Sequence, residues 1–103
     1  MAFGQTIAEA RKKAGLSQKA LAARIKKEDG SPISPQYLND LEWDRRNSPS
    51  PHFLHQLAAE LHLPEEYLVV MAKQYPEDLH DGPHPPETVQ AAFRAFRKEL
   101  KGR

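Results

Sequence analysis

The sequence predicts an all-α protein with five short helices, then a proline-rich segment, then a terminal amphipathic helix. Apolar residues recur at the three- and four-residue spacing of a helix, and Ser or Pro stands at most of the expected helix starts. No segment alternates apolar and polar residues over several positions, as a half-buried strand would. The 103 residues suit one small domain with a short extension.

The composition excludes several classes of protein. The chain has no cysteine, which excludes disulfides, thiolate metal sites and cysteine catalysis and agrees with a reducing compartment. It has no run of about 18 apolar residues, and its N-terminus lacks the charged and apolar segments of a secretory signal. We therefore expect a cytoplasmic protein with no membrane partner.

Three helices are predicted in the first 43 residues. Gly15 ends the first, and Ser17 and Ser34 can each accept a free backbone N–H at the start of a helix. Pro35 suits a first helical position, where its missing N–H costs nothing. The predicted ranges are 3–14, 18–27 and 35–43, and their apolar sides contain Phe3, Ile7, Ala10, Ala20, Leu21, Ile25, Leu38 and Leu41.

Two more helices are predicted before the proline-rich segment. Ser50 is expected to cap the first, which covers residues 51–62. Pro64 begins the second, which carries two glutamates in its first turn, where the helix dipole favours them, and ends at Pro76. Their apolar residues are Leu54, Leu57, Ala58, Leu61, Leu68, Val69, Met71 and Ala72.

The rest of the chain divides into a proline-rich linker, residues 77–86, and a terminal helical segment, residues 87–103. The formal charge is +3 over residues 1–51, −6 over 52–88 and +4 over 89–103. The terminal segment places four apolar residues on one side of a helix, the apolar seam Val89, Phe93, Phe96 and Leu100. Burying two phenylalanines contributes about 1.5–3 kcal/mol each. The seam is therefore expected to be covered by its own domain, by the same seam in a homodimer or by another protein.

The most informative pattern is the pair of helices predicted at 18–27 and 35–43. Two short capped helices, the second opening with exposed polar residues, suit a helix-turn-helix, whose second helix lies in the major groove of DNA. The segments LSQKALAARI and ISPQYLNDLEWDRRNSPS resemble the Cro/repressor-type regulators, or XRE family, and the resemblance runs from about Phe3 to Leu79. It implies a lambda-repressor-like five-helix domain over residues 1–76 that binds double-stranded DNA, usually as a dimer on a palindromic site.

The resemblance also implies which residues contact DNA. Gln36 and Asn39 are expected to read bases, because their side chains can pair bidentately with adenine. Tyr37 lies beside them and fits the core equally well. The other residues expected to bind DNA, at the backbone or at the start of the reading helix, are Gln18, Lys26, Ser34, Arg45 and Arg46. An ordinary solvated residue is the alternative interpretation for Gln18, Gln36, Asn39, Arg45 and Arg46.

Two departures from the family affect this interpretation. About six extra residues, KEDGSP, separate the two helices where the family has a tight turn. This loop is expected to bulge outward, with Lys26 and Lys27 approaching the DNA backbone. Asp40 is the second departure, because a carboxylate facing the groove repels phosphate. Its alternatives are a bond with a cytosine amino group, a salt bridge to Arg45 or a cap on a turn. Trp43 is expected to pack at the helix end.

Other kinds of chemistry have little support in the sequence. His52, His55 and His62 share one predicted helix but lack a carboxylate at a ligand spacing, so no metal site is expected. The adjacent Glu65 and Glu66 point apart on a helix, and no serine stands on a nucleophile turn. We therefore expect neither an enzyme nor a cofactor.

The sequence as a whole predicts a sequence-specific transcription regulator. The expected mechanism is repression by operator occupancy, with the helix at about 35–43 in the major groove. The alternative is an antitoxin-type protein-interaction module of a toxin–antitoxin pair, in which the acidic middle of the chain or the terminal helix would cover a partner protein.

Overall fold

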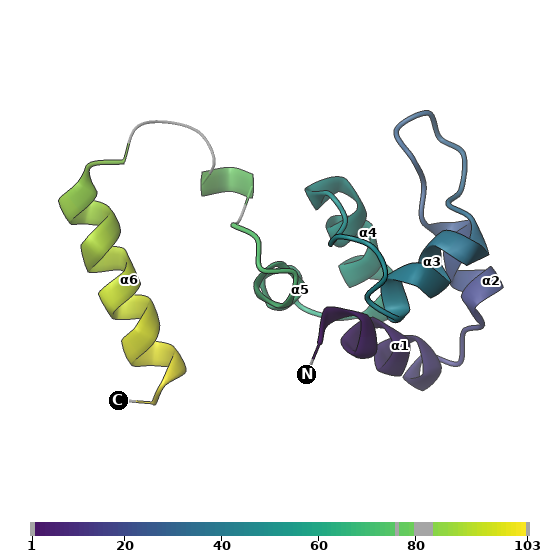
Figure 1. Ribbon diagram of the computed structural model, residues 1–103, viewed down its shortest axis with the longest axis horizontal. Helices are drawn as coiled ribbons and strands as arrows, with labels where there is room; N and C mark the ends of the chain where they lie inside the picture. Colours follow the sequence, from purple (N-terminus) through teal and green to yellow (C-terminus); the bar gives the residue numbers. More distant parts are fainter. Residues whose placement is uncertain (1, 76, 80–83, 103) are drawn as a thin grey trace.

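The computed structural model describes residues 2–75, 77–79 and 84–102 as a succession of helices (Figure 1). The helices are α1 (Phe3–Lys13), α2 (Gln18–Arg24), α3 (Pro35–Glu42), α4 (Pro51–Leu61), α5 (Glu65–Met71), the 3-10 helix η1 (Glu77–Leu79) and α6 (Pro86–Leu100). Across these described ranges, extended pairing is limited to an isolated bridge between Lys26 and Pro32. The expected all-α fold of five helices and a C-terminal helix is confirmed.

Helices α1 to α5 surround one apolar core. α3 packs against α1 and α2, while α4 packs against α5 and α1. The buried core residues are Phe3, Ile7, Leu21, Ala22, Ile25, Ile33, Leu38, Leu54, Leu57, Ala58, Leu61, Leu68, Val69 and Ala72. Each fully buried Leu or Ile stabilises the fold by about 1.5–3 kcal/mol relative to exposure. The apolar spacing in the sequence therefore identified most of this core.

The helix starts follow the expected chemistry with two exceptions. Ser17 and Ser34 cap α2 and α3, since their hydroxyls accept the N–H groups of Ala20 and Tyr37, each at 3.0 Å. Ser50 occupies the N-cap position of α4, but its side chain makes no capping hydrogen bond, so that expectation was wrong. Pro64 is likewise the N-cap residue of α5 rather than its first helical residue.

The second helix is shorter than expected, because the chain turns into a hairpin after Arg24. Ile25 adopts an extended conformation, and its carbonyl accepts the N–H of Ile33 at 2.9 Å. Both isoleucines are buried, so closing the hairpin gains core contacts that another helical turn would lose. The predicted end at Lys27 was therefore wrong. The connection from Ile25 to Ser34, here named the α2–α3 hairpin, projects from the body as expected (Figure 1).

The remaining helix ends lie close to their expected positions except in α5. Gly15 adopts the left-handed conformation (φ 73°) that ends α1. α5 ends at Met71, because Lys73 adopts a left-handed conformation (φ 58°) and its N–H donates to the Val70 carbonyl at 2.9 Å. Pro76, which was expected to end this helix, lies outside the described residues.

The start of α1 lies directly against the end of α3. A Cβ atom at Gly4 would overlap the carbonyl oxygens of Leu41 and Glu42, so only glycine allows this approach. The Gly4 N–H donates to Asp44 Oδ1 at 3.0 Å, and Asp44 itself has a positive φ of 56°. The turn after α3 thus supplies a hydrogen-bond acceptor to a free N–H of α1.

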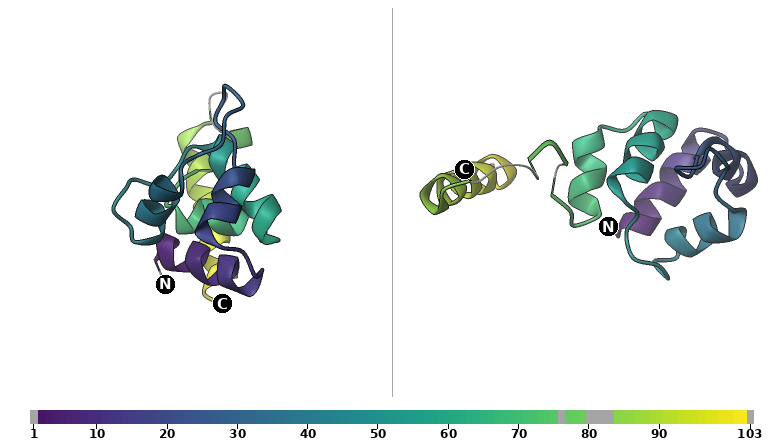
Figure 2. Two further views of the ribbon diagram at one scale, coloured as in Figure 1. Left: turned by 90° about the vertical axis from the view of Figure 1, so that its right-hand side faces the viewer. Right: turned by 90° about the horizontal axis from the view of Figure 1, so that it is seen from above.

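Helix α6 lies at the end of the molecule opposite the α2–α3 hairpin, beyond α5 (Figures 1 and 2). None of its residues is fully buried. η1 falls within the expected linker, and residues 80–83 of that linker lie outside the described residues. Within the described part of the chain, every helix is too short or too polar to cross a membrane.

Candidate nucleic-acid interface

The first turn of α3 presents polar side chains to solvent. Ser34 caps the helix, and Pro35 occupies its first position, where no N–H is needed. Both residues and the following Gln36 are exposed, whereas Leu38 is buried in the core. The burial of one side of α3 therefore determines which side chains face outward at its N-terminus.

A hydrogen-bonded network fixes α3 against α1 and α2. Gln18 Nε2 donates to Asn39 Oδ1 at 3.0 Å and to Glu42 Oε1 at 2.9 Å. Glu42 also accepts from Arg11 Nε at 2.6 Å, within a buried ion pair. Two of the expected DNA-binding residues, Gln18 and Asn39, thus contact each other directly. Sequence reasoning missed the role of Arg11 and Glu42, because their separation of 31 positions leaves no local signal.

Asp40 brings together three of the expected DNA-binding residues. Its Oδ1 accepts from Gln36 Nε2 at 3.0 Å and lies 3.7 Å from an Arg45 nitrogen, while Oδ2 lies 3.7 Å from Arg46 Nε. The Asp40 carbonyl also accepts the Arg45 N–H at 2.8 Å. Of the alternatives open for Asp40, the salt bridge to Arg45 is present. The hydrogen bond between Gln36 and Asp40 could have been predicted, because residues four apart on a helix lie side by side.

Tyr37 belongs partly to the core and partly to this surface. Its ring packs edge-on against Phe53, with centroids 6.1 Å apart, and the Arg46 guanidinium lies 5.6 Å from its centroid. Burial raises the pKa of the Tyr37 hydroxyl above its ordinary value, and the nearby arginine partly opposes that rise. The structure therefore supports the packing role that the sequence left open beside DNA contact.

Side chains of α4 hold the base of the α2–α3 hairpin. Gln56 Oε1 accepts the Lys26 N–H at 2.7 Å, and Gln56 Nε2 donates to the Lys26 carbonyl at 2.8 Å. His52 Nε2 lies 3.0 Å from the same carbonyl. The Lys26 ammonium donates to the Ala23 carbonyl at 2.7 Å, at the end of α2. Lys26 therefore lies at the base of the hairpin, and Lys27 is exposed on it.

Trp43 does not pack as expected. It follows the last residue of α3, and 67% of its surface is exposed. The C-terminal turn of α3 is closed instead by backbone hydrogen bonds, including the Trp43 N–H donating to the Asn39 carbonyl at 3.1 Å. The indole is therefore left on the surface near Asp44.

The histidines of α4 have structural partners. His52 contacts the α2–α3 hairpin, and His55 Nδ1 lies 2.7 Å from Glu65 Oε1 at the start of α5. No group of three or more His, Cys, Asp or Glu side chains that could hold a metal occurs among the residues that the structure describes. These contacts account for His52 and His55 as residues that join neighbouring elements.

Comparison with known families agrees with the geometry. A family model described as helix-turn-helix matches residues 7–68, which include α2, the α2–α3 hairpin and α3. Neither the curated proteins nor the solved structures provide a match. The family match covers more than half of the chain, and the chain therefore belongs to the helix-turn-helix family of Cro/repressor-type DNA-binding regulators.

Proposed function

We propose that the protein is a sequence-specific repressor that acts by occupying an operator, with α3 in the major groove. The observation that carries the proposal is the first turn of α3, where Gln36 is exposed and shares Asp40 as a partner with two arginines. A helix of this kind fits the major groove, whose base edges distinguish all four base pairs. Occupancy of a promoter would block transcription without any catalytic group.

Within this proposal the expected residues take two roles. Gln36 and Asn39 read base edges, since a carboxamide offers both a donor and an acceptor. The residues proposed to hold the backbone or to border the reading helix are Gln18, Lys26, Ser34, Tyr37, Arg45 and Arg46. We propose residues 1–76 as the DNA-binding domain, 77–86 as a linker and 87–103 as an association helix.

The test is a binding selection on sheared genomic DNA with the full chain, repeated with Gln36→Ala. We expect the wild-type protein to enrich one or a few short palindromic sites, and Gln36→Ala to lose them while keeping its helical circular dichroism. Gln5→Ala, at an exposed glutamine of α1, is the matched control and should retain the sites. An absence of enriched sites for the wild-type protein would contradict specific binding. Transcription from an enriched promoter, with and without protein, tests repression.

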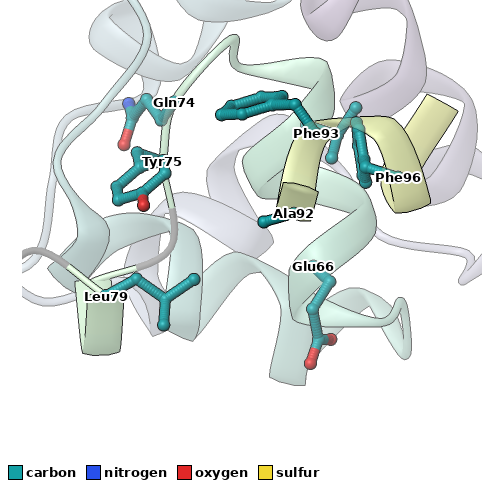
Figure 3. Close-up of a pocket in the computed structure, with 8 residues that line it drawn as sticks. Glu66, Gln74, Tyr75, Leu79, Ala92, Phe93 and Phe96 are labelled. Atoms are coloured by element: carbon teal, nitrogen blue, oxygen red, sulfur yellow. The ribbon is translucent and has the colours of Figure 1, made fainter. Parts of the chain in front are cut away.

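The apolar seam of α6 supports a second part of the proposal, a homodimer. A groove of about 410 Å³ lies between α5 and α6, and its walls include Tyr75, Phe93 and Phe96 (Figure 3). Phe93 and Phe96 remain 42% and 45% exposed. Exposing this apolar surface to water is unfavourable, since burying a phenylalanine side chain stabilises a protein by about 1.5–3 kcal/mol. An open groove lined by exposed residues of the seam is a surface that can receive a helix.

Charge favours a second copy as the occupant. α5 begins with Glu65 and Glu66, and Glu66 borders the groove. The exposed sides of α6 carry the basic residues Arg94, Arg97 and Lys98, and Lys101 follows as its C-cap residue. Because one surface is acidic and the other basic, two copies can pair reciprocally, as a two-fold interface requires. Two domains joined in this way would also suit a palindromic site.

The mass of the full chain in solution tests the dimer. We expect light scattering at micromolar concentrations to give twice the 11.7 kDa chain mass. The double variant Phe93→Ser/Phe96→Ser should be monomeric, whereas Ala91→Ser, on the opposite side of the helix, should remain dimeric. A monomeric wild-type protein would contradict the dimer.

The exposed seam also favours the antitoxin interpretation, in which another protein covers α6. Its genomic signature would be a small neighbouring reading frame in the same operon. The two interpretations are separated by co-expressing that neighbour with the wild-type protein and with Phe93→Ser/Phe96→Ser. A stable complex formed by the wild-type chain and lost in the variant would favour the antitoxin role.

A further inference from the structure

We propose that Asp40 is a specificity-determining residue that orients Gln36 for base reading and weakens the hold of Arg45 and Arg46 on phosphate. This inference rests on the proposed function, in which α3 lies in the major groove. Asp40 would then lower the affinity for DNA of any sequence and raise the selectivity at one base pair.

The first half of the inference comes from the contact within α3. Gln36 and Asp40 are four residues apart on the helix, so their side chains lie on one face. Gln36 Nε2 donates to Asp40 Oδ1 at 3.0 Å, and Gln36 is otherwise exposed. A free carboxamide could rotate and present its donor and acceptor in either order. The bond to Asp40 selects one order, and base reading depends on that order.

The second half comes from the two arginines. Arg45 and Arg46 approach the Asp40 carboxylate to 3.7 Å, well beyond the 2.7–2.9 Å of a close charge-assisted hydrogen bond. Their side chains are 61% and 59% exposed, against 17% for Asp40. Such loose surface pairs restrain the arginines little. The carboxylate therefore mainly lowers the positive potential that a phosphate would meet, within the screening length of about 10 Å.

Two variants separate these effects. Asp40→Asn retains a carbonyl oxygen that can accept from Gln36, but it removes the charge. Asp40→Ala removes both the acceptor and the charge. If the inference holds, both variants strengthen binding to any DNA, but only Asp40→Ala loses selectivity at the base that Gln36 reads.

The experiment measures binding of the full chain to its selected site and to single-base variants of that site over a range of salt concentrations. We expect Asp40→Asn to bind all sequences several-fold more tightly and to keep its base preference. We expect Asp40→Ala to lose roughly tenfold in discrimination at one base pair, the scale of one bidentate contact. Gln36→Ala should lose discrimination at the same base pair, and the double variant Gln36→Ala/Asp40→Ala should lose no more than Gln36→Ala alone.

Three results would overturn the inference. One is unchanged base preference in a folded Asp40→Ala variant, and another is a loss in Asp40→Asn as large as in Asp40→Ala. The third is weaker or unchanged general affinity in Asp40→Asn, which can be measured even if Asp40→Ala does not fold. Failure of the proposed function is distinct, because the wild-type protein itself would then select no site.

Discussion

Arg11 and Glu42 form a buried, bidentate ion pair that joins α1 to the last residue of α3. Arg11 Nε lies 2.6 Å from Glu42 Oε2, and the second guanidinium nitrogen donates to Oε1 at 3.0 Å. The third nitrogen donates to the Leu16 carbonyl at 2.9 Å, so each guanidinium nitrogen has an acceptor. Because Gln18 also donates to Glu42, one carboxylate positions α3 against both of the preceding helices.

Replacing Glu42 with Ala should therefore destabilise the fold severely. The variant leaves the Arg11 charge buried without its partner and removes an acceptor from Gln18. Breaking a buried pair in this way costs about 3–5 kcal/mol, a large share of the roughly 5–15 kcal/mol that holds a small domain folded. Urea denaturation followed by circular dichroism measures the loss.

The matched control is the exposed ion pair between Arg24 and Glu60, whose atoms lie 3.4 Å apart. Glu60→Ala should cost less than about 1 kcal/mol, because surface pairs are screened by water. Equal losses in Glu42→Ala and Glu60→Ala would contradict the account of the buried pair.

Gly4→Ala should also destabilise the protein, for a steric reason. Its new Cβ would lie only 2.5 Å from the Leu41 carbonyl oxygen and would also overlap the Glu42 carbonyl oxygen. Both oxygens belong to the backbone, which cannot move aside as a flexible side chain could. Forcing α1 away from α3 should cost about 1–3 kcal/mol, measured as a lower midpoint of thermal unfolding. Gln5→Ala, one residue along on an exposed site, should be nearly neutral. An unchanged midpoint for Gly4→Ala would mean that α1 and α3 are farther apart.

Gln56→Ala should loosen the α2–α3 hairpin without unfolding the domain. The variant removes both hydrogen bonds to the Lys26 backbone, each worth roughly 1 kcal/mol. The Lys26 amide should then exchange with deuterated solvent faster than in the wild-type protein. His52→Ala removes a single contact to the same carbonyl and should have a smaller effect. Equal exchange in all three proteins would show that the hairpin does not depend on α4.

Asp29 should have a pKa below the ordinary value for an aspartate. Hydrogen bonds from the Ser31 hydroxyl (2.6 Å) and N–H (2.9 Å) lower its pKa. The pKa of Asp29 is lower in the folded chain than in the unfolded chain, where it is about 3.9. The hydrogen bonds to Asp29 therefore stabilise the fold above the unfolded pKa, and this stabilisation is lost as the pH falls through the folded pKa. NMR titration should show the pKa rising in Ser31→Ala and staying low in Ser31→Thr. A pKa unaffected by Ser31→Ala would exclude the hydroxyl as its cause.

The salt dependence of DNA binding should identify the phosphate contacts. Each phosphate neutralised contributes about 0.9 to the slope of log affinity against log salt. We expect a shallow slope for the wild-type chain, and a decrease of about two in Arg45→Ala/Arg46→Ala if both arginines bind phosphate. Lys26→Ala/Lys27→Ala tests the hairpin in the same way, and an unchanged slope and affinity would exclude these lysines. A wild-type slope implying about ten or more contacts per chain would contradict the small footprint.

Local chemistry made much of the helical framework predictable. Ser17 and Ser34 determine helix starts through hydrogen bonds within a few residues, and Pro35 does so through its fixed φ. Gly15 ends α1 through its own backbone freedom. Apolar spacing identified most of the core, because the residues on one side of a helix recur at fixed short intervals along the sequence. The expectation for Ser50 failed although the residue type was right, because a cap also depends on the orientation of the side chain.

The position of the candidate site required longer-range contacts. The Gln18–Asn39 contact and the Arg11–Glu42 pair join residues 21 and 31 positions apart, and their geometry exists only after the helices pack. The exposed Trp43 and the hairpin held by Gln56 likewise depend on neighbours distant in sequence.

The sequence by itself determined the helical class, the caps of α2 and α3, most of the core and the resemblance to helix-turn-helix regulators, because these depend on residue type and on spacing along a helix. Only the tertiary structure decided that α2 ends at Arg24, that Glu42 joins α3 to Arg11 and Gln18, and that Phe93, Phe96 and Leu100 of the α6 seam stay exposed. The reason is physical. Side-chain hydrogen bonds and burial require two surfaces to meet, and which surfaces meet is set by the packing of the whole core.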